Sequence, residues 1–167
     1  MQPLISEDEY LRIGFEPDAE FEDGLVFERT GGDLNHSALH GALATYFFVR
    51  RKEWDIVPYI SVHIKAREGR YMIPDICVYS LPKPLGQILT TPPLIWIEIL
   101  SPEDRHVRLT KRVKEALAMG CPYVWLIDPY TLESVSHTAK GSTVLDDGIL
   151  RIPGTKIVVP LSEVLED

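Results

Sequence analysis

A single carboxylate interrupts an apolar segment near the middle of the chain. Glu98 stands within LIWIEILSPED, residues 94–104, among large apolar side chains. Such a run is typical of a buried strand. A buried carboxylate is costly unless it is paired, neutralised or bound to a metal ion. The segment therefore predicts a cation at Glu98, either a metal ion or a buried arginine or lysine that serves only the structure.

A second carboxylate lies in a segment that would bring it close to Glu98. In IPDICVY, strand alternation puts Asp75, Cys77 and Tyr79 on one face, and in WIEIL it puts Trp96 with Glu98. If the two strands are neighbours, about 4.8 Å apart, the carboxylates converge and repel each other. A divalent cation removes that repulsion. Mg²⁺, or Mn²⁺ in its place, takes one or two carboxylates plus waters and phosphate oxygens, an arrangement that hydrolyses phosphodiesters. Taken alone, Asp75 would also suit the cap of a turn.

The N-terminal third of the chain predicts elements from local signals. Ser6 and Glu9 form a capping box that starts a short helix. Asp23-Gly24 between two alternating runs predicts a β-hairpin. Apolar residues at helical spacing predict an amphipathic helix over residues 36–53.

The rest of the chain alternates strands with one long helix. Residues 56–66 alternate with Ile60, Val62 and Ile64 on one face, and residues 71–79 continue as another strand in which Pro74 marks a start, a bulge or an edge. Buried strands are predicted over residues 94–100 and 122–129. Between them, a helix over residues 102–119 begins after a Ser101 N-cap and ends at a glycine. Two or three short strands and a helical turn follow. This order predicts an α/β fold with a mixed sheet and helices packed on it.

Composition limits the class of protein. The 167 residues are enough for one domain, 1–167, and 45% hydrophobic with 25% charged residues is typical of a globular protein. No apolar stretch approaches the roughly 18 residues of a membrane span, and the acidic start is unlike a signal peptide. Cys77 and Cys121 lie in apolar segments without metal-ligand spacing, so we expect two buried thiols in a reducing cytoplasm.

Charge is segregated along the chain. The net charge of −8 argues against a nucleic-acid partner at first sight. Residues 1–28, however, hold nine acids and one base, whereas residues 50–114 hold twelve bases and seven acids. This segregation would permit a basic face on an acidic protein, although charge runs are more often solvated surface.

Several motifs together resemble a known family. Asp75 follows a proline and, after 22 intervening residues, Glu98 follows at a strand end before a helix. This pattern resembles the PD-(D/E)XK nuclease superfamily and, more closely, the Uma-two family of putative restriction endonucleases. AEFEDGLVFE is similar to that family's YELxDGE hairpin with Glu20 on its glutamate, and His36 falls on its following histidine. IEILSPEDR is similar to VEVLSPST, and GCPYVWLIDP to GVxEYWxVDP. The resemblance covers nearly the whole chain.

The resemblance implies a restriction endonuclease-like fold, a mixed β-sheet flanked by helices, and a Mg²⁺- or Mn²⁺-dependent endonuclease. Its partner would be nucleic acid, with double-stranded DNA as the expected form, and a two-fold dimer would suit cleavage of both strands. Asp75, Glu98 and the backbone carbonyl of Ile99 would hold the metal. Glu20 would assist, and Arg112 would bind the transferred phosphate.

Three further residues are candidates for phosphate-binding or supporting roles. Lys111 and Lys114 flank Arg112 on the helix, where they would contact phosphate or form a solvated face, and His36 falls in the family's pattern. His36 and His40, four residues apart on a helix, also have a spacing that can bind zinc, but no third ligand is evident.

The chain departs from the superfamily where a lysine is expected. Leu100 stands two residues after Glu98, where the superfamily has its lysine. Arg112 stands at the position where the family has a lysine on the following helix. An arginine can stabilise developing phosphate charge but cannot act as a neutral base. The alternative is therefore a catalytically impaired family member that binds nucleic acid or a protein without cutting.

Overall fold

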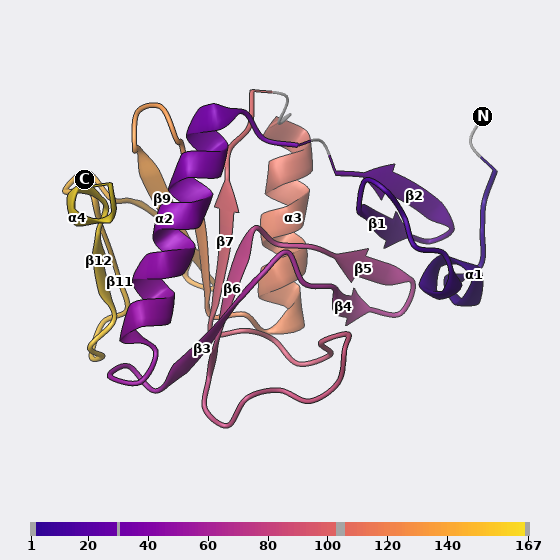
Figure 1. The fold of residues 1–167 in the computed structure, drawn as a ribbon, viewed down its shortest axis with the longest axis horizontal. Helices are drawn as coiled ribbons and strands as arrows, with labels where there is room; N and C mark the ends of the chain where they lie inside the picture. Colours follow the sequence, from indigo (N-terminus) through magenta and orange to yellow (C-terminus); the bar gives the residue numbers. More distant parts are fainter. Residues whose placement is uncertain (1–2, 30, 103–105, 166–167) are drawn as a thin grey trace.

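A mixed sheet forms the centre of the molecule. The computed structural model describes residues 3–29, 31–102 and 106–165 (Figure 1). The strand order in the main sheet is β10-β9-β8-β7-β6-β3, in which only β7 and β8 are parallel among the described strands. The strands are β3 (Ile56–Ile60), β6 (Ile76–Ser80), β7 (Ile95–Ile99), β8 (Tyr123–Ile127), β9 (Ser134–Thr138) and β10 (Gly141–Val144).

Two long helices cover opposite faces of this sheet. Helix α2 (Leu34–Arg50) packs Leu39, Leu43 and Phe47 on the face that carries Ile95 and Ile97. Helix α3 (His106–Met119) packs on the opposite face, which carries Cys77 and Trp96. The C-terminal elements close the core on the α2 side: β11 (Ile149–Arg151), β12 (Val158–Pro160) and α4 (Leu161–Val164). The fold is thus mixed α/β with helices on both faces, as the sequence predicts.

A smaller sheet lies beside α3 (Figure 1). It has the order β2-β1-β5-β4 and comprises β1 (Ala19–Glu22), β2 (Leu25–Glu28), β4 (Ile64–Arg67) and β5 (Arg70–Met72), with α1 (Glu7–Arg12) packed against it. The predicted N-cap and hairpin are confirmed: Ser6 accepts from the Glu9 amide, and the β1–β2 turn places Asp23 and Gly24 at φ of 47° and 95°. Positive φ at both turn residues is the requirement that Asp-Gly meets most readily.

Two of the predicted strands are each divided between the sheets. Residues 56–66 were expected to form one strand, but the chain turns at Ser61, which has a φ of 48°. Strand β3 therefore joins the main sheet and β4 the smaller one. Ile60 is consequently 54% exposed while Ile64 is buried, so the predicted shared face is wrong. Residues 71–79 are likewise divided into β5 and β6, with Pro74 between them.

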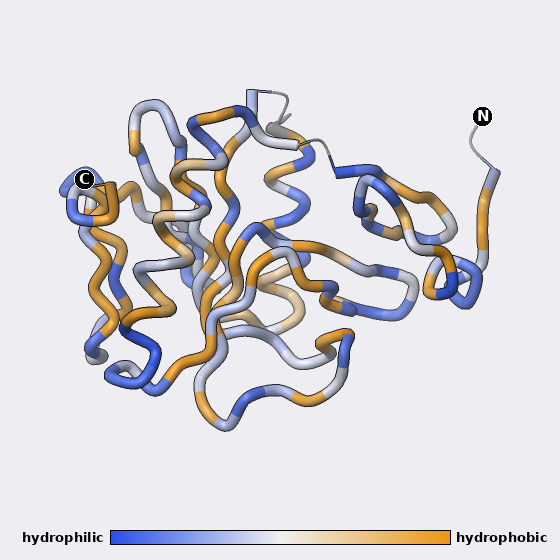
Figure 2. The backbone as a smooth tube through the Cα atoms, viewed as in Figure 1, coloured by the Kyte–Doolittle hydropathy of each residue, from blue (hydrophilic) through white to orange (hydrophobic). Residues whose placement is uncertain are grey.

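Most of the remaining predictions hold with small shifts at the element ends, but two or three short strands were expected after residue 129 and the described residues form four, β9 to β12. Helix α2 begins two residues early, after the N-cap Asp33. Strands β7 and β8 and the end of α3 before Gly120, whose φ is 107°, are confirmed. Ser101 and Pro102 precede α3 in non-helical backbone, and the predicted first helical turn at 103–105 lies outside the described residues. Figure 2 shows that hydrophobic residues follow the central strands, whereas the β4–β5 tip and the loop after α2 are hydrophilic.

Candidate functional site

The two predicted metal ligands lie on adjacent strands. Strands β6 and β7 pair antiparallel with Ile76 opposite Ile97, and Asp75, directly before β6, approaches the far end of β7. There its Oδ2 accepts a hydrogen bond of 2.8 Å from the Ile99 amide. Asp75, Glu98 and Ile99 line one cavity of about 410 Å³. The predicted convergence of the two strands is confirmed.

The Glu98 carboxylate has protein contacts on one oxygen. It is 6% exposed, and its Oε1 accepts hydrogen bonds from Trp96 Nε1 at 2.6 Å and Arg112 Nε at 3.1 Å, with a third from Arg112 Nη2. Within the described residues, Oε2 accepts no hydrogen bond. Burial raises the pKa of Glu98 to about 7, Arg112 opposes the rise, and the nearby Asp75 charge adds to it. The charge on Glu98 is thus only partly compensated.

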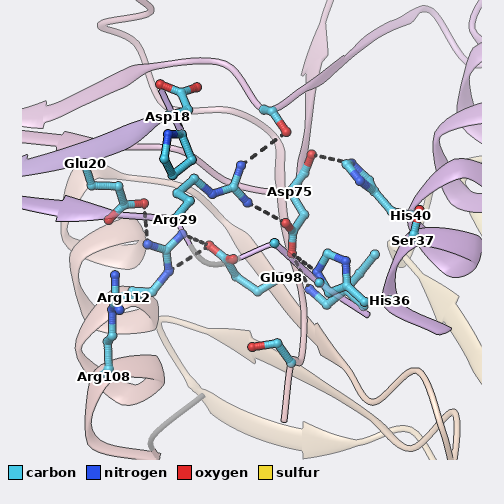
Figure 3. A pocket seen from close by; sticks show the side chains of 16 residues that line it. Asp18, Glu20, Arg29, His36, Ser37, His40, Asp75, Glu98, Arg108 and Arg112 are labelled. Atoms are coloured by element: carbon cyan, nitrogen blue, oxygen red, sulfur yellow. Dashed lines mark hydrogen bonds and ion pairs between the residues drawn. The ribbon is translucent and has the colours of Figure 1, made fainter. Parts of the chain in front are cut away.

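Arg112 bridges two buried carboxylates from different sheets. Its guanidinium donates to Glu98, to Glu20 Oε1 and, at 3.2 Å, to the Ile73 carbonyl. The side chain turns toward Glu98, as predicted, yet the group expected to bind phosphate is occupied by protein partners. The structural ion pair considered for Glu98 is therefore present (Figure 3).

Glu20 reaches the site from β1 in the smaller sheet. It is 1% exposed. Its Oε1 also accepts from the Ile73 amide at 2.8 Å, and its Oε2 accepts from Arg70 at 3.2 Å. Burial opposes ionisation, but Arg112 and Arg70 hold the pKa of Glu20 below its ordinary value. With both oxygens bound by cations, Glu20 holds Arg112 in place.

Asp75 is surrounded by donors on both oxygens. Besides the Ile99 amide, Arg29 Nη2 donates to Oδ1 at 2.6 Å, and His36 Nε2 lies 3.4 Å from Oδ2. His40 Nε2 donates at 2.9 Å to the Asp75 carbonyl. Burial opposes ionisation, but His36, Arg29 and the Ile99 amide hold the pKa of Asp75 below its ordinary value. His36 therefore joins the site, together with His40 one turn further along α2.

The predicted lysines lie elsewhere. Lys111 is 53% exposed and pairs with Glu22, and Lys114 is exposed. Neither is among the described residues that line the cavity. Helical geometry explains this, because Arg112 faces the core, whereas Lys111, one residue before it, and Lys114, two residues after it, lie on the exposed side of the helix.

Sequence reasoning missed two arginines that line the cavity, Arg29 and Arg108. Arg108 precedes Arg112 by four residues, so helical spacing places it on the same face and would have identified it. Among the described residues Arg108 has no carboxylate partner, and its guanidinium carbon lies 5.8 Å from the Phe27 ring centre. Arg29 meets Asp75 across 46 residues of sequence, and no local signal indicates that contact.

The donor set fits a hard divalent cation that keeps several waters. Across the described ranges, no three His, Cys, Asp or Glu side chains are grouped so as to hold a metal ion. Mg²⁺, however, requires only one or two carboxylates. Glu98 Oε2 and Asp75 would supply these, with the Ile99 carbonyl as a backbone ligand. The incompletely compensated charge on Glu98 supports this fit.

Comparison with known proteins identifies the family and the fold. A family model described as "Putative restriction endonuclease", Uma2, matches residues 7–151. The chain is similar in structure to a putative nuclease belonging to DUF820 from Anabaena variabilis ATCC 29413. The TM-score is 0.82 and the identity 22%, with 96% of this chain and 97% of the other covered, which shows a shared fold. No curated protein matches. Since the family match spans most of the sequence, this chain belongs to the Uma2 family of putative restriction endonucleases.

Proposed function

We propose that this protein is a Mg²⁺- or Mn²⁺-dependent endonuclease that hydrolyses phosphodiester bonds of nucleic acid, with double-stranded DNA as the expected substrate. One arrangement carries the proposal. Asp75 lies beside Glu98, and the Oε2 atom of Glu98 accepts no hydrogen bond within the described residues. A purely structural glutamate would be expected to engage both oxygens, as Glu20 does.

Each residue has a distinct task in this proposal. Asp75, Glu98 and the Ile99 carbonyl bind the cation. Arg112 and Trp96 orient Glu98 through hydrogen bonds to its Oε1 atom and leave its Oε2 atom to bind the cation. A bound cation would supply charge stabilisation at the phosphate and a more acidic water.

Phosphate binding is assigned to Arg108 in place of Arg112. Arg108 lines the same cavity, is exposed, and contacts no carboxylate within the described part of the chain. Arg112 has its donors directed at Glu20, Glu98 and Ile73. An arginine without an internal partner gains more from a phosphate than one that must first leave two buried carboxylates.

The second candidate is a family member that binds nucleic acid without cutting it. The cavity lining favours this reading, because it includes no lysine among the described residues, and Leu100 stands at the superfamily's lysine position. An arginine cannot take a proton from water. The two candidates share the fold and the acidic pair, so only an assay separates them.

A cleavage assay tests the proposal directly. Supercoiled plasmid, single-stranded DNA and RNA are incubated with the parent chain, Asp75→Asn and Glu98→Gln in Mg²⁺, Mn²⁺ or chelator. We expect cleavage only by the parent and only with metal. Direct linearisation of plasmid would indicate a dimer that cuts both strands. Retained binding without cleavage in either metal would support the binding module instead.

A further inference from the structure

Arg29 makes a contact that the proposed chemistry does not use. Its Nη2 donates to Asp75 Oδ1 at 2.6 Å, and its Nη1 donates to Ser61 Oγ at 3.2 Å. The guanidinium thus lies against one of the two carboxylates assigned to the cation, inside the same cavity (Figure 3).

Three arginines of the described residues contact the buried acids of this region, and Arg29 is the least enclosed of them. The side chains of Arg70 and Arg112 are 5% and 10% exposed, and each also donates to backbone carbonyls. The Arg29 side chain is 25% exposed, and its guanidinium donates only to Asp75 and Ser61 within the described residues. Of the three, Arg29 can leave its carboxylate for solvent at the lowest cost.

Asp75 stays in position without Arg29. Its other oxygen, Oδ2, keeps the Ile99 amide at 2.8 Å and His36 at 3.4 Å. Oδ1, by contrast, accepts a hydrogen bond only from Arg29 among the described residues. A divalent cation on Oδ1 would meet a like charge at hydrogen-bonding distance from the same atom, and like charges at that range repel strongly in a partly buried site.

We propose that Arg29 is a built-in competitor for the metal position of Asp75 and therefore sets the metal affinity of the site. The inference rests on the proposed function, because it requires Asp75 to be a metal ligand. In the metal-free protein the guanidinium neutralises Asp75. A cation that binds there displaces the guanidinium, and the free energy of that displacement weakens the observed affinity.

Calorimetric titration with Mn²⁺, without nucleic acid, tests the inference. The samples are the parent, Arg29→Gln and a matched control, Arg151→Gln. Arg151 also pairs with an aspartate at 2.6 Å, outside the cavity, so the control loses the same charge and the same kind of contact. We expect Arg29→Gln to bind Mn²⁺ about ten- to a hundredfold more tightly than the parent, the range for one charge-assisted hydrogen bond. Arg151→Gln should match the parent.

Other outcomes separate the inference from the proposed function. If the parent binds Mn²⁺ and Arg29→Gln binds it equally or more weakly, the competitor role is wrong while the metal site stands. If no protein in the series binds Mn²⁺, the metal site and the inference both fail. Should Arg29→Gln be misfolded by circular dichroism, Arg29→Met decides, because methionine keeps an unbranched side chain and removes the charge. The affinity of Arg29→Met for Mn²⁺ should exceed that of the parent, and an equal affinity would overturn the inference.

Discussion

The Glu98 carboxylate illustrates how one buried group can serve structure and chemistry at once. Oε1 accepts the hydrogen bonds from Trp96 and Arg112, which orient the side chain. In contrast to the fully engaged Glu20, its pKa is raised to about 7, chiefly by burial. A group held in position but incompletely neutralised is suited to take up a cation.

Arg112 and Arg108, on one face of α3, give opposite predictions on replacement by alanine. Arg112→Ala leaves Glu20 and Glu98 buried without their shared cation and should lower the free energy of unfolding by about 3–5 kcal/mol. Arg108→Ala should change the free energy of unfolding by less than about 0.5 kcal/mol. It should, however, reduce the slope of the logarithm of the DNA-binding constant against the logarithm of the salt concentration by about 0.9, the value of one phosphate contact.

Urea unfolding and binding titrations at several salt concentrations measure these effects. The exposed Lys114→Ala on the same helix is the control and should leave both stability and slope unchanged. A stable Arg112→Ala variant would show that the two carboxylates do not depend on this cation, and an unchanged slope for Arg108→Ala would remove Arg108 from the phosphate site.

The acidic pair could be placed from local geometry, because strand alternation brought Asp75 and Glu98 together. Arg112 was placed toward them by its match to the family's helix lysine and by no local signal. Arg29, at the end of β2, and Arg70, in β5, could not be placed from the sequence. Each contacts a carboxylate that lies 46 or 50 residues away along the chain. The contact of Arg29 with Asp75 depends on how the two sheets join, and that of Arg70 with Glu20 on the pairing of β1 with β5. No local pattern records either arrangement.

At the scale of elements, the sequence predictions failed where the backbone adopts a conformation that the residue type does not favour. The period-2 pattern runs unbroken through residues 56–66, yet Ser61 at a φ of 48° turns the chain from one sheet to the other. A serine gives little warning of this, whereas Asp23-Gly24 and Gly120 occupy positive φ where their residue types predict it. The elements with capping or turn signals were therefore predictable, and the sheet crossing was not.

Glu7 holds the first helix against the smaller sheet. Its carboxylate accepts hydrogen bonds of 2.6 Å from Lys65 and Tyr71 and of 3.2 Å from the Gly69 amide. Lys65 first, and then Tyr71, lower the pKa of Glu7 to about 2. A carboxyl whose folded pKa is depressed stabilises the protein above its unfolded pKa, and this stabilisation is lost as the pH falls toward the folded value.

We therefore predict that Glu7→Gln lowers the free energy of unfolding at pH 7 by about 1–2 kcal/mol, after allowance for solvent screening of a partly exposed pair. The difference from the parent should shrink as the pH falls from 5 toward 2, as followed by urea unfolding. Glu68→Gln is the control, because Glu68 contacts the same lysine but is 87% exposed. A difference that stays constant with pH would mean that the charge of Glu7 is unimportant.

Over the whole molecule, the two charge blocks neutralise each other in part. Bases of residues 50–114 form ion pairs with acids of residues 1–28, and these bases are Lys65, Arg67, Arg70, Lys111 and Arg112. This internal pairing reduces the basic face that the segregation of charge along the chain permits. Among the described cavity residues, Arg29 and Arg108 form no ion pair with the acids of residues 1–28. At the cavity, a nucleic acid would therefore meet mainly Arg29 and Arg108 among the described arginines, so we expect its binding to depend on the metal site.

The measurement that tests the central claim most directly is a set of melting curves for the parent and Glu98→Gln, each with and without Mn²⁺. Glu98→Gln keeps the shape of the side chain and removes its charge. If Glu98 is a metal ligand, Mn²⁺ at a hundredfold excess over its dissociation constant should stabilise the parent by about 2.7 kcal/mol and raise its Tm. The same addition should leave the variant almost unchanged, and the metal-free variant should be at least as stable as the metal-free parent. A parent that does not respond to Mn²⁺, beside a variant destabilised by roughly 3 kcal/mol or more, would show that Glu98 serves only its ion pair with Arg112.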